Sequence, residues 1–314
     1  HPEVAGIGLY EYCDQWARAG KPEVQEDTDA REFWGLVTAE RTPKQTYRAA
    51  TEMFRLILRN EELILRWKSP ARVLVSQQDL DWWKLGIADS QYHERIAAEL
   101  YRSGVSFRFV DSDGLLSLDP QTTPRLVLCD SILGSNPDGS ADAVGRLISY
   151  VENGGNLLYI SRMPWQQLYG KTGLPPEFVP GGETTPVARG YGHGQIGLLP
   201  VYEADPGKLR YYLLDYLAEA LKDRPVASVD YPEGDGPVYW RVFEDGDDRW
   251  LLMVNVGGKP IQRLKLILGP KVALGQLNRT ESDGGGLRAE GKDVVYDGLN
   301  VYALIKIRAP KGGW

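Results

Sequence analysis

The sequence of 314 residues predicts an α/β fold and an all-β fold joined in one chain. Between residues 70 and 224, short apolar strands alternate with amphipathic helices, which is typical of a doubly wound parallel sheet. Residues 225–314 carry short strands separated by Gly and Asp, which predicts a small antiparallel β-sandwich. Residues 1–67 hold only one strand, a polar loop and one helix, and such a unit cannot bury both of its faces alone. We take these three segments as the predicted domains.

The first segment opens with a strand at Gly6–Glu11, where a glycine-punctuated apolar run ends in polar and aromatic side chains. A buried parallel strand has this appearance when its C-terminal tip opens into a site. A helix is predicted from Thr42 to Leu58, because Thr42 suits the N-cap and Pro43 the first helical position. Its predicted buried face consists of the apolar residues at helical spacing, which are Tyr47, Ala50, Phe54, Ile57 and Leu58.

The second segment contains four short apolar strands separated by helices. The helix before the fourth strand ends at Asn153-Gly154-Gly155, a good C-terminal stop. The glycine-rich stretch 189–200 lacks the Gly-Lys-Ser/Thr of a phosphate loop and predicts a tight turn that enters a strand. The predicted strands are 71–77, 105–111, 125–133 and 156–161, and the predicted helices are 91–102, 141–152 and 208–221.

The third segment starts with a hairpin over residues 238–257, joined through Glu244-Asp245-Gly246-Asp247. Further strands are predicted at 263–268, 272–277 and 300–307. Apolar side chains alternate along both hairpin strands, which indicates core faces, with a carbohydrate-binding platform as the alternative. The alternating sets are Val238, Trp240 and Val242 on the first strand, and Trp250, Leu252 and Val254 on the second.

Charge and composition exclude several classes of partner. The net charge of −7 and the pI of about 5.2 argue against nucleic acid and against an anionic membrane surface. No run of about 18 apolar residues occurs, so we expect no transmembrane helix. Two cysteines and three scattered histidines do not form a metal-binding motif. We therefore expect no metal and no cofactor.

Cys129 and His193 invite comparison with the nucleophile and base of a class I amidotransferase. A nucleophile elbow needs small neighbours because its turn is strained, whereas Cys129 lies between Leu128 and Asp130. Cys129 also precedes the helix that starts at Ala141, while the elbow of that fold follows the next strand. We therefore interpret Cys129 as a buried apolar residue without a catalytic role.

Residues Gly6–Gln15 resemble the eighth barrel strand of (β/α)8 glycoside hydrolases. Family 2 β-galactosidases carry a run of the same shape there: glycines, apolar residues, an aromatic, an acid, an aromatic and then Asp-Gln. Gly35–Val37 and Arg41–Lys44 are similar to the segments that lead into the last barrel helix of these enzymes. Residues 125–161 resemble the amidotransferase-like trimerisation domain of family 42 β-galactosidases. The third segment, residues 225–314, stands where those enzymes have a C-terminal β-domain.

This resemblance implies that residues 1–67 are the last βα unit of a (β/α)8 barrel. Retaining glycoside hydrolases use two carboxylates about 5 Å apart, and in the resembled families these groups end strands four and seven. The resemblance therefore places both catalytic residues before residue 1 and none in this chain. Glu11 is a weak catalytic candidate, with structural hydrogen bonding or substrate contact as its alternative roles.

The resemblance also supplies the substrate-binding candidates. Tyr10 holds the position of the strand-eight aromatic that lines the sugar site in those families, and packing is its alternative role. Asp14, Gln15 and Trp16 follow at the mouth of the barrel. The predicted substrate-binding set is therefore Tyr10, Glu11, Asp14 and Trp16.

The function implied is the C-terminal portion of a retaining, β-galactosidase-like glycoside hydrolase. This portion would supply part of the sugar-site wall and the scaffold for assembly. The implied partners are a carbohydrate substrate, a preceding barrel polypeptide and further copies of the chain in a homotrimer. The rival hypothesis is a non-catalytic assembly or carbohydrate-binding protein with the same architecture. Catalytic glutamates at two strand ends upstream would favour the enzyme.

Overall fold

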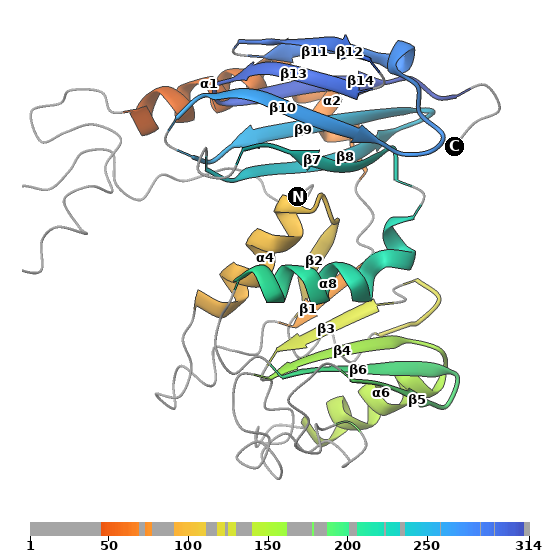
Figure 1. Cartoon of the computed structure of the whole chain (residues 1–314). Helices are drawn as coiled ribbons and strands as arrows, with labels where there is room; N and C mark the ends of the chain where they lie inside the picture. Colours follow the sequence, from red (N-terminus) through yellow and green to blue (C-terminus); the bar gives the residue numbers. More distant parts are fainter. Residues whose placement is uncertain are drawn as a thin grey trace, which may run out of the picture.

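The computed structural model describes residues 45–68, 73–76, 91–110, 118–122, 125–129, 140–161, 178, 187–200, 206–222, 224–232, 236–257, 259–282, 284–291 and 293–310. Over these residues the protein is mostly β-sheet with few helices (Figure 1). One half is a six-stranded sheet with helices on both faces, and the other half consists of two four-stranded sheets. No helix in this part of the chain is long and apolar enough to cross a membrane.

The six-stranded sheet is parallel over five strands and has one antiparallel strand at its edge. Its order is β2 (Phe107–Val110), β1 (Val73–Ser76), β3 (Arg125–Cys129), β4 (Asn156–Ser161), β6 (Gly194–Pro200) and β5 (Val187–Tyr191). The first five pair in parallel, as predicted for the apolar runs of the second segment. The glycine-rich stretch forms the antiparallel hairpin of β5 and β6, with Gly192 at a φ of 58° in its turn.

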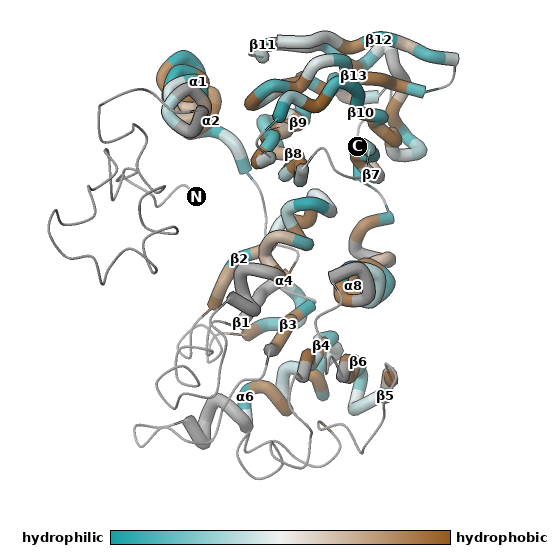
Figure 2. The backbone as a smooth tube through the Cα atoms, turned by 60° about the vertical axis from the view of Figure 1, so that its left-hand side comes forward, coloured by the Kyte–Doolittle hydropathy of each residue, from teal (hydrophilic) through white to brown (hydrophobic). Residues whose placement is uncertain are grey.

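Helices cover this sheet on both sides. α4 (Gln91–Arg102) and α8 (Pro206–Leu221) lie on the face toward the sandwich, and α6 (Ser140–Glu152) lies on the far face (Figures 1 and 2). The face under α4 and α8 buries Val73, Val127, Leu158, Ile160 and Leu199, together with Ile96, Leu100, Leu209, Leu213 and Leu217 from the helices. The face under α6 buries Leu126, Leu128, Leu157, Tyr159, Ile196 and Leu198, together with Leu147, Tyr150 and Val151 from the helix.

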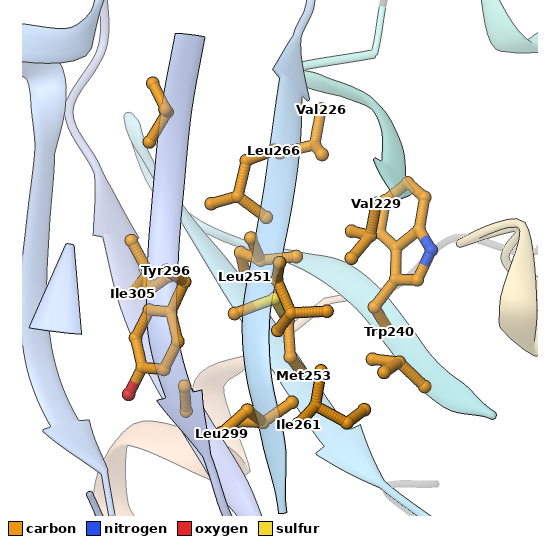
Figure 3. Close-up of a cluster of buried hydrophobic side chains, with 14 of the residues drawn as sticks. Val226, Val229, Trp240, Leu251, Met253, Ile261, Leu266, Tyr296, Leu299 and Ile305 are labelled. Atoms are coloured by element: carbon orange, nitrogen blue, oxygen red, sulfur yellow. The ribbon is translucent and has the colours of Figure 1, made fainter. Parts of the chain in front are cut away.

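The second half is an antiparallel β-sandwich. One sheet has the order β12 (Gly286–Glu290), β13 (Asp293–Leu299), β10 (Ile261–Leu268) and β7 (Val226–Asp230). The other has the order β11 (Leu277–Ser282), β14 (Tyr302–Ile307), β9 (Asp248–Asn255) and β8 (Val238–Asp245). Alternate side chains of the two sheets meet in one core (Figure 3), which includes Val229, Trp240, Leu251, Met253, Leu266, Tyr296 and Ile305.

Two predictions for the sandwich were incomplete. The strand predicted at residues 272–277 is wrong, because the chain forms a short 3₁₀ turn, Leu274–Gln276, and β11 begins only at Leu277. The Gln276 side chain stabilises this turn by accepting a hydrogen bond from the backbone N–H of Ala273 at 2.6 Å. β7, β12 and β13 were not predicted, although Gly291 supplies a left-handed turn between β12 and β13.

The outer faces of the two sandwich sheets differ in chemistry. The outer face of β12-β13-β10 carries cross-strand ion pairs, such as Arg263–Glu290 at 2.6 Å and Lys265–Asp293 at 2.8 Å. The outer face of the other sheet carries apolar side chains instead, and the helix pair α1 (Gln45–Arg59) and α2 (Glu61–Arg66) packs on it. Figure 2 shows these two helices end-on beside β8 and β9. Trp250 and Leu252, predicted as core residues, therefore lie under the helix pair.

The predicted buried face of α1 is not the face that contacts the sandwich. Leu56, which was left out of that prediction, is 1% exposed, whereas Leu58 is 74% exposed. The two residues lie on opposite sides of the helix because successive residues are about 100° apart. The helix therefore has a second apolar side, which the sequence pattern alone did not single out. The predicted first turn at Thr42 and Pro43 lies outside the described residues.

The two halves of the protein are joined through the C-terminal end of α4. Trp240 of β8 donates a hydrogen bond from Nε1 to the carbonyl of Arg102 at 2.7 Å. Arg224 donates to the carbonyl of Ser103, and its guanidinium lies 5.2 Å from the centre of the Trp240 ring. Gly104 lies directly against the same ring. These contacts tie the parallel sheet to the sandwich.

Candidate functional site

The predicted sugar-site residues lie outside the described part of the chain. Tyr10, Glu11, Asp14, Gln15 and Trp16 all precede α1, where the description begins. Their roles therefore stay predictions. The structure does describe the helix that follows them and the surface on which this helix is held.

The helix pair is held on the sandwich by a compact apolar cluster. Leu56 of α1 is buried against Trp250, Tyr302 and Leu304. Trp67, which follows α2, stacks on Phe243 with ring centres 4.5 Å apart and an angle of 18° between the rings. Stacked aromatic pairs add to the stabilisation that comes from burial. The contacts come from three neighbouring strands, β8, β9 and β14.

A carboxylate pins the junction between α1 and α2. Glu281 of β11 accepts hydrogen bonds from the Asn60 side chain at 2.5 Å, from the Tyr302 hydroxyl at 2.9 Å and from Arg59 at 3.2 Å. Asn60 also donates to the carbonyl of Leu56 at 2.9 Å, so the same side chain closes the end of α1. These hydrogen bonds therefore fix the end of α1 next to the buried Leu56.

The groups around Glu281 favour its ionised form. Burial acts to raise the pKa of this carboxyl group, but hydrogen bonds from Asn60, Tyr302 and Arg59 outweigh burial and lower the pKa below its ordinary value. Burial and the hydrogen bond to Glu281 raise the pKa of Tyr302. A carboxylate whose oxygens are occupied by three donors is suited to holding a structure together rather than to transferring protons.

We expect acidic pH to weaken the hydrogen bonds that Glu281 accepts from Asn60, Tyr302 and Arg59. A lowered pKa in the folded state means that Glu281 stabilises the folded chain above the ordinary glutamate pKa of about 4.3, and that this contribution is lost as the pH falls through the lower folded value. The gap in unfolding free energy between wild type and Glu281→Gln should therefore shrink below about pH 4. Denaturant unfolding followed by tryptophan fluorescence at pH 7 and below pH 4 measures this gap. A gap independent of pH would contradict the expectation.

The amidotransferase comparison fails on geometry as well as on sequence. Cys129 ends β3 and pairs with Ile160, near the carboxyl edge of the parallel sheet. His193 lies in the turn before β6, at the opposite edge, where its N–H donates to the carbonyl of Glu152. Ile160 pairs with Leu199 of β6, and Leu199 follows His193 by six residues, which corresponds to about 20 Å along the strand. The two residues therefore cannot form a catalytic pair, and the described residues contain no cluster of three or more metal-ligating side chains.

Arg241 forms a second polar feature that the sequence analysis missed. Its guanidinium lies 5.4 Å from the ring centre of Tyr101 and 5.6 Å from that of Phe107. Its Nε and Nη2 atoms are buried without a hydrogen-bond acceptor. Burial lowers the pKa of this group, although an arginine remains a cation at neutral pH. Tyr101 also stacks on Tyr239 at 5.4 Å, so these side chains bind α4 to β8.

The alternation along β8 was the available signal for this cluster. Trp240 points into the sandwich core, so Tyr239 and Arg241 must point to the outer face. The sequence could not indicate that α4 covers them there. A contact between the two halves of the protein depends on the tertiary arrangement.

The described geometry can be compared with known proteins. The sequence matches no protein-family model and no curated protein. Among solved structures, the chain is similar to a catalytic mutant of Gan42B, a GH42 β-galactosidase from G. stearothermophilus, with a TM-score of 0.55 and 12% identity over 95% of this chain. The chain shares its fold with part of the GH42 β-galactosidases. Identity at this level supports a common fold alone.

Two further β-galactosidases give the same result. The enzyme from Rahnella sp. R3 has a TM-score of 0.54 and 12% identity, and it matches 95% of this chain. The enzyme from Bacillus circulans sp. alkalophilus has a TM-score of 0.53 and 10% identity, again over 95% of this chain. The chain spans about half the length of these proteins, with 48% covered in the Gan42B and Rahnella enzymes and 49% in the Bacillus enzyme.

Proposed function

We propose that this chain is the C-terminal portion of a retaining, β-galactosidase-like glycoside hydrolase that hydrolyses β-glycosidic bonds. In this proposal, residues 1–67 are the last βα unit of a (β/α)8 barrel and residues 70–224 are an amidotransferase-like domain. Residues 225–314 are the C-terminal β-domain. Tyr10, Glu11, Asp14 and Trp16 form part of the sugar-site wall, and the catalytic carboxylates belong to the preceding barrel polypeptide.

One observation carries this proposal. The similarity to GH42 β-galactosidases extends over 95% of the chain rather than over a single sheet. A match of this extent takes in residues of both the mixed six-stranded sheet and the β-sandwich. Similarity to the six-stranded sheet alone, or to the β-sandwich alone, would carry little functional information, because such folds host many unrelated functions.

The proposal also includes self-association through residues 70–224. In the resembled family 42 enzymes, the domain at this place is the trimerisation domain. The opposite-edge placement of Cys129 and His193 favours a structural role for this half over glutamine hydrolysis. A homotrimer is accordingly the assembly that we propose.

Purified chain 1–314 should not hydrolyse aryl β-galactosides, and addition of the barrel polypeptide should restore hydrolysis. The physical reason is that retaining hydrolysis needs two carboxylates about 5 Å apart, and the proposal assigns both to the barrel. Release of the aryl leaving group, measured before and after addition, checks this expectation. The barrel polypeptide alone serves as the control.

Two outcomes would contradict the proposal in different ways. Robust hydrolysis by residues 1–314 alone would mean that the catalytic carboxylates lie in this sequence, and Glu11→Gln would then be the first variant to measure. A complete protein that binds galactosides or assembles without hydrolysing them would favour the rival hypothesis of a non-catalytic protein.

A further inference from the structure

α1 has more apolar surface than the sandwich covers. Successive residues of an α-helix lie about 100° apart, and a surface helix typically has one apolar stripe about 100° wide. The apolar residues of α1 extend over about 200° of the helix surface. In order around the helix they are Leu56, Ala49, Met53, Ile57, Ala50, Phe54, Tyr47 and Leu58. The charged residues Glu52, Arg55 and Arg59 occupy the remaining side.

The sandwich contacts only one part of this arc. Leu56 is 1% exposed, and Met53 packs against the same cluster. Leu58 follows Leu56 by two residues, so it lies about 200° further around the helix, and it is 74% exposed. Phe54 lies on the same side as Leu58 and belongs to none of the buried clusters in the described part of the chain. The side of α1 that carries Phe54 and Leu58 therefore faces away from the sandwich.

α2 repeats this arrangement. Leu63 packs against the cluster that contains Leu56, whereas Leu65, two residues later, is 70% exposed. Among the described residues, Leu58 and Leu65 are the two most exposed large apolar side chains. Each lies opposite a side chain that contacts the sandwich. We call Phe54, Leu58 and Leu65 the outward surface of the helix pair.

The outward surface has the chemistry of an interface. Exposed apolar side chains that gather on one surface mark a site of interaction, whereas single ones are common on any protein. The outer face of β12-β13-β10 presents ion pairs to water instead, such as Arg263–Glu290 at 2.6 Å. Leucine side chains offer no hydrogen-bonding group, so a partner that covers Leu58 and Leu65 must present apolar side chains of its own.

Two observations favour a polypeptide that this chain does not contain as the partner. The chain spans about half the length of the GH42 β-galactosidases that match 95% of it, so these proteins hold about as much chain again outside the match. The helix pair also lies on the sandwich, whereas self-association is proposed through residues 70–224, which form the other half (Figure 1). A second copy is therefore expected on the half that lacks the outward surface.

We infer that the outward surface is the docking site of the barrel polypeptide named in the proposed function. α1 then packs between two bodies, because its Leu56 side contacts the sandwich and its Leu58 side contacts the barrel polypeptide. This inference rests on the proposed function, since that function supplies the barrel polypeptide. It assigns the contact to three side chains of the described structure.

Labelling of introduced cysteines by a maleimide tests the inference. Leu58→Cys and Leu65→Cys place a thiol on the outward surface, and Tyr211→Cys, at a position of α8 that is 68% exposed, is the matched control. In chain 1–314 all three thiols should react at similar rates, because all three positions are exposed. Mass spectrometry of peptides separates these thiols from Cys13 and Cys129.

The same variants are then labelled in the complete protein, which includes the barrel polypeptide. We expect Leu58→Cys and Leu65→Cys to react at least about tenfold more slowly than in chain 1–314, because the reagent needs an accessible thiol. Tyr211→Cys should react at an unchanged rate.

Leu58→Lys gives a second measurement, which depends on the free energy of the contact. A lysine at this exposed helical position should leave the thermal midpoint of chain 1–314 unchanged. In the complete protein the same charge would be buried against apolar side chains, so we expect the midpoint to fall by several degrees. Tyr211→Lys should leave both midpoints unchanged.

Each outcome decides the inference. Equal labelling rates of Leu58→Cys in chain 1–314 and in the complete protein overturn it. Slow labelling in chain 1–314 itself also overturns it. If dilution then restores fast labelling, a second copy covers the surface, and if labelling stays slow at every concentration, residues 1–44 cover it.

The hydrolysis assay separates this inference from the proposed function. Slow labelling of Leu58→Cys in a complete protein without hydrolytic activity supports the docking site and overturns the proposed function. Fast labelling of the same variant in an active complete enzyme overturns the docking site alone.

Discussion

Replacing Gly104 by alanine should destabilise the protein by about 3 kcal/mol, the sum of a left-handed backbone and an overpacked contact. Gly104 has a φ of +63° at the end of α4, where its N–H bonds to the carbonyl of Tyr101 at 3.1 Å and the N–H of Val105 bonds to that of Leu100 at 2.9 Å. A Cβ atom at this position would overlap the ring of Trp240. That ring cannot move away without losing its hydrogen bond to Arg102 and its place in the sandwich core.

Gly246→Ala separates the two causes of this loss. Gly246 has a φ of +60° in the turn between β8 and β9, and a Cβ atom there would meet no atom within 4 Å. This variant should cost only about 1 kcal/mol, which is the backbone contribution alone. Denaturant unfolding of the two variants against wild type measures the difference. Equal losses would mean that the close contact with Trp240 adds nothing to the cost of replacing Gly104.

Leu56→Ala should detach the helix pair from the sandwich. The side chain is 1% exposed among Trp250, Tyr302 and Leu304, and removing such a leucine costs about 3 kcal/mol. The loss falls on a local contact, so we expect the helix pair to open while the sandwich core stays folded. Hydrogen exchange in α1 and limited proteolysis after Arg59 or Arg66 would detect this opening.

Leu58→Ala provides the control on the same helix. The change in helix propensity is the same, but Leu58 is 74% exposed, so its loss should change stability by no more than about 0.5 kcal/mol. Equal exchange rates in the two variants would contradict docking through the Leu56 side of α1. Faster exchange in Leu58→Ala alone would instead favour the side that the sequence pattern predicts.

Local signals in the sequence determined most elements of the α/β half, although the antiparallel edge strand β5 was not predicted. The predicted stop at Asn153-Gly154-Gly155 is confirmed, because Gly154 has a φ of 101° and the N–H groups of Gly154 and Gly155 bond to the carbonyls of Val151 and Tyr150. The strands at residues 73, 107, 125 and 156 pair in parallel as their continuous apolar runs indicate. Such features depend on neighbouring residues, so one sequence suffices to predict them.

The candidate site could be predicted only through resemblance to a family. Tyr10, Glu11, Asp14 and Trp16 carry no pattern that identifies a sugar by itself, and they lie outside the described residues. The similarity to GH42 β-galactosidases concerns the fold alone, so the roles of these residues stay predictions. Their chemistry depends on neighbours from other strands, which no local pattern contains.

The tertiary structure alone decided which surfaces are covered. Two apolar sides of α1 are visible in the sequence once Leu56 and Leu58 are compared, but only the folded chain shows that Leu56 meets Trp250. Likewise, the alternation along β8 shows that Trp240 and Arg241 lie on opposite faces of the strand. It does not show which face α4 contacts. Periodicity determines the side of an element on which a residue lies. Its partner depends on the packing of segments far apart in the chain, because burial is a property of the whole fold.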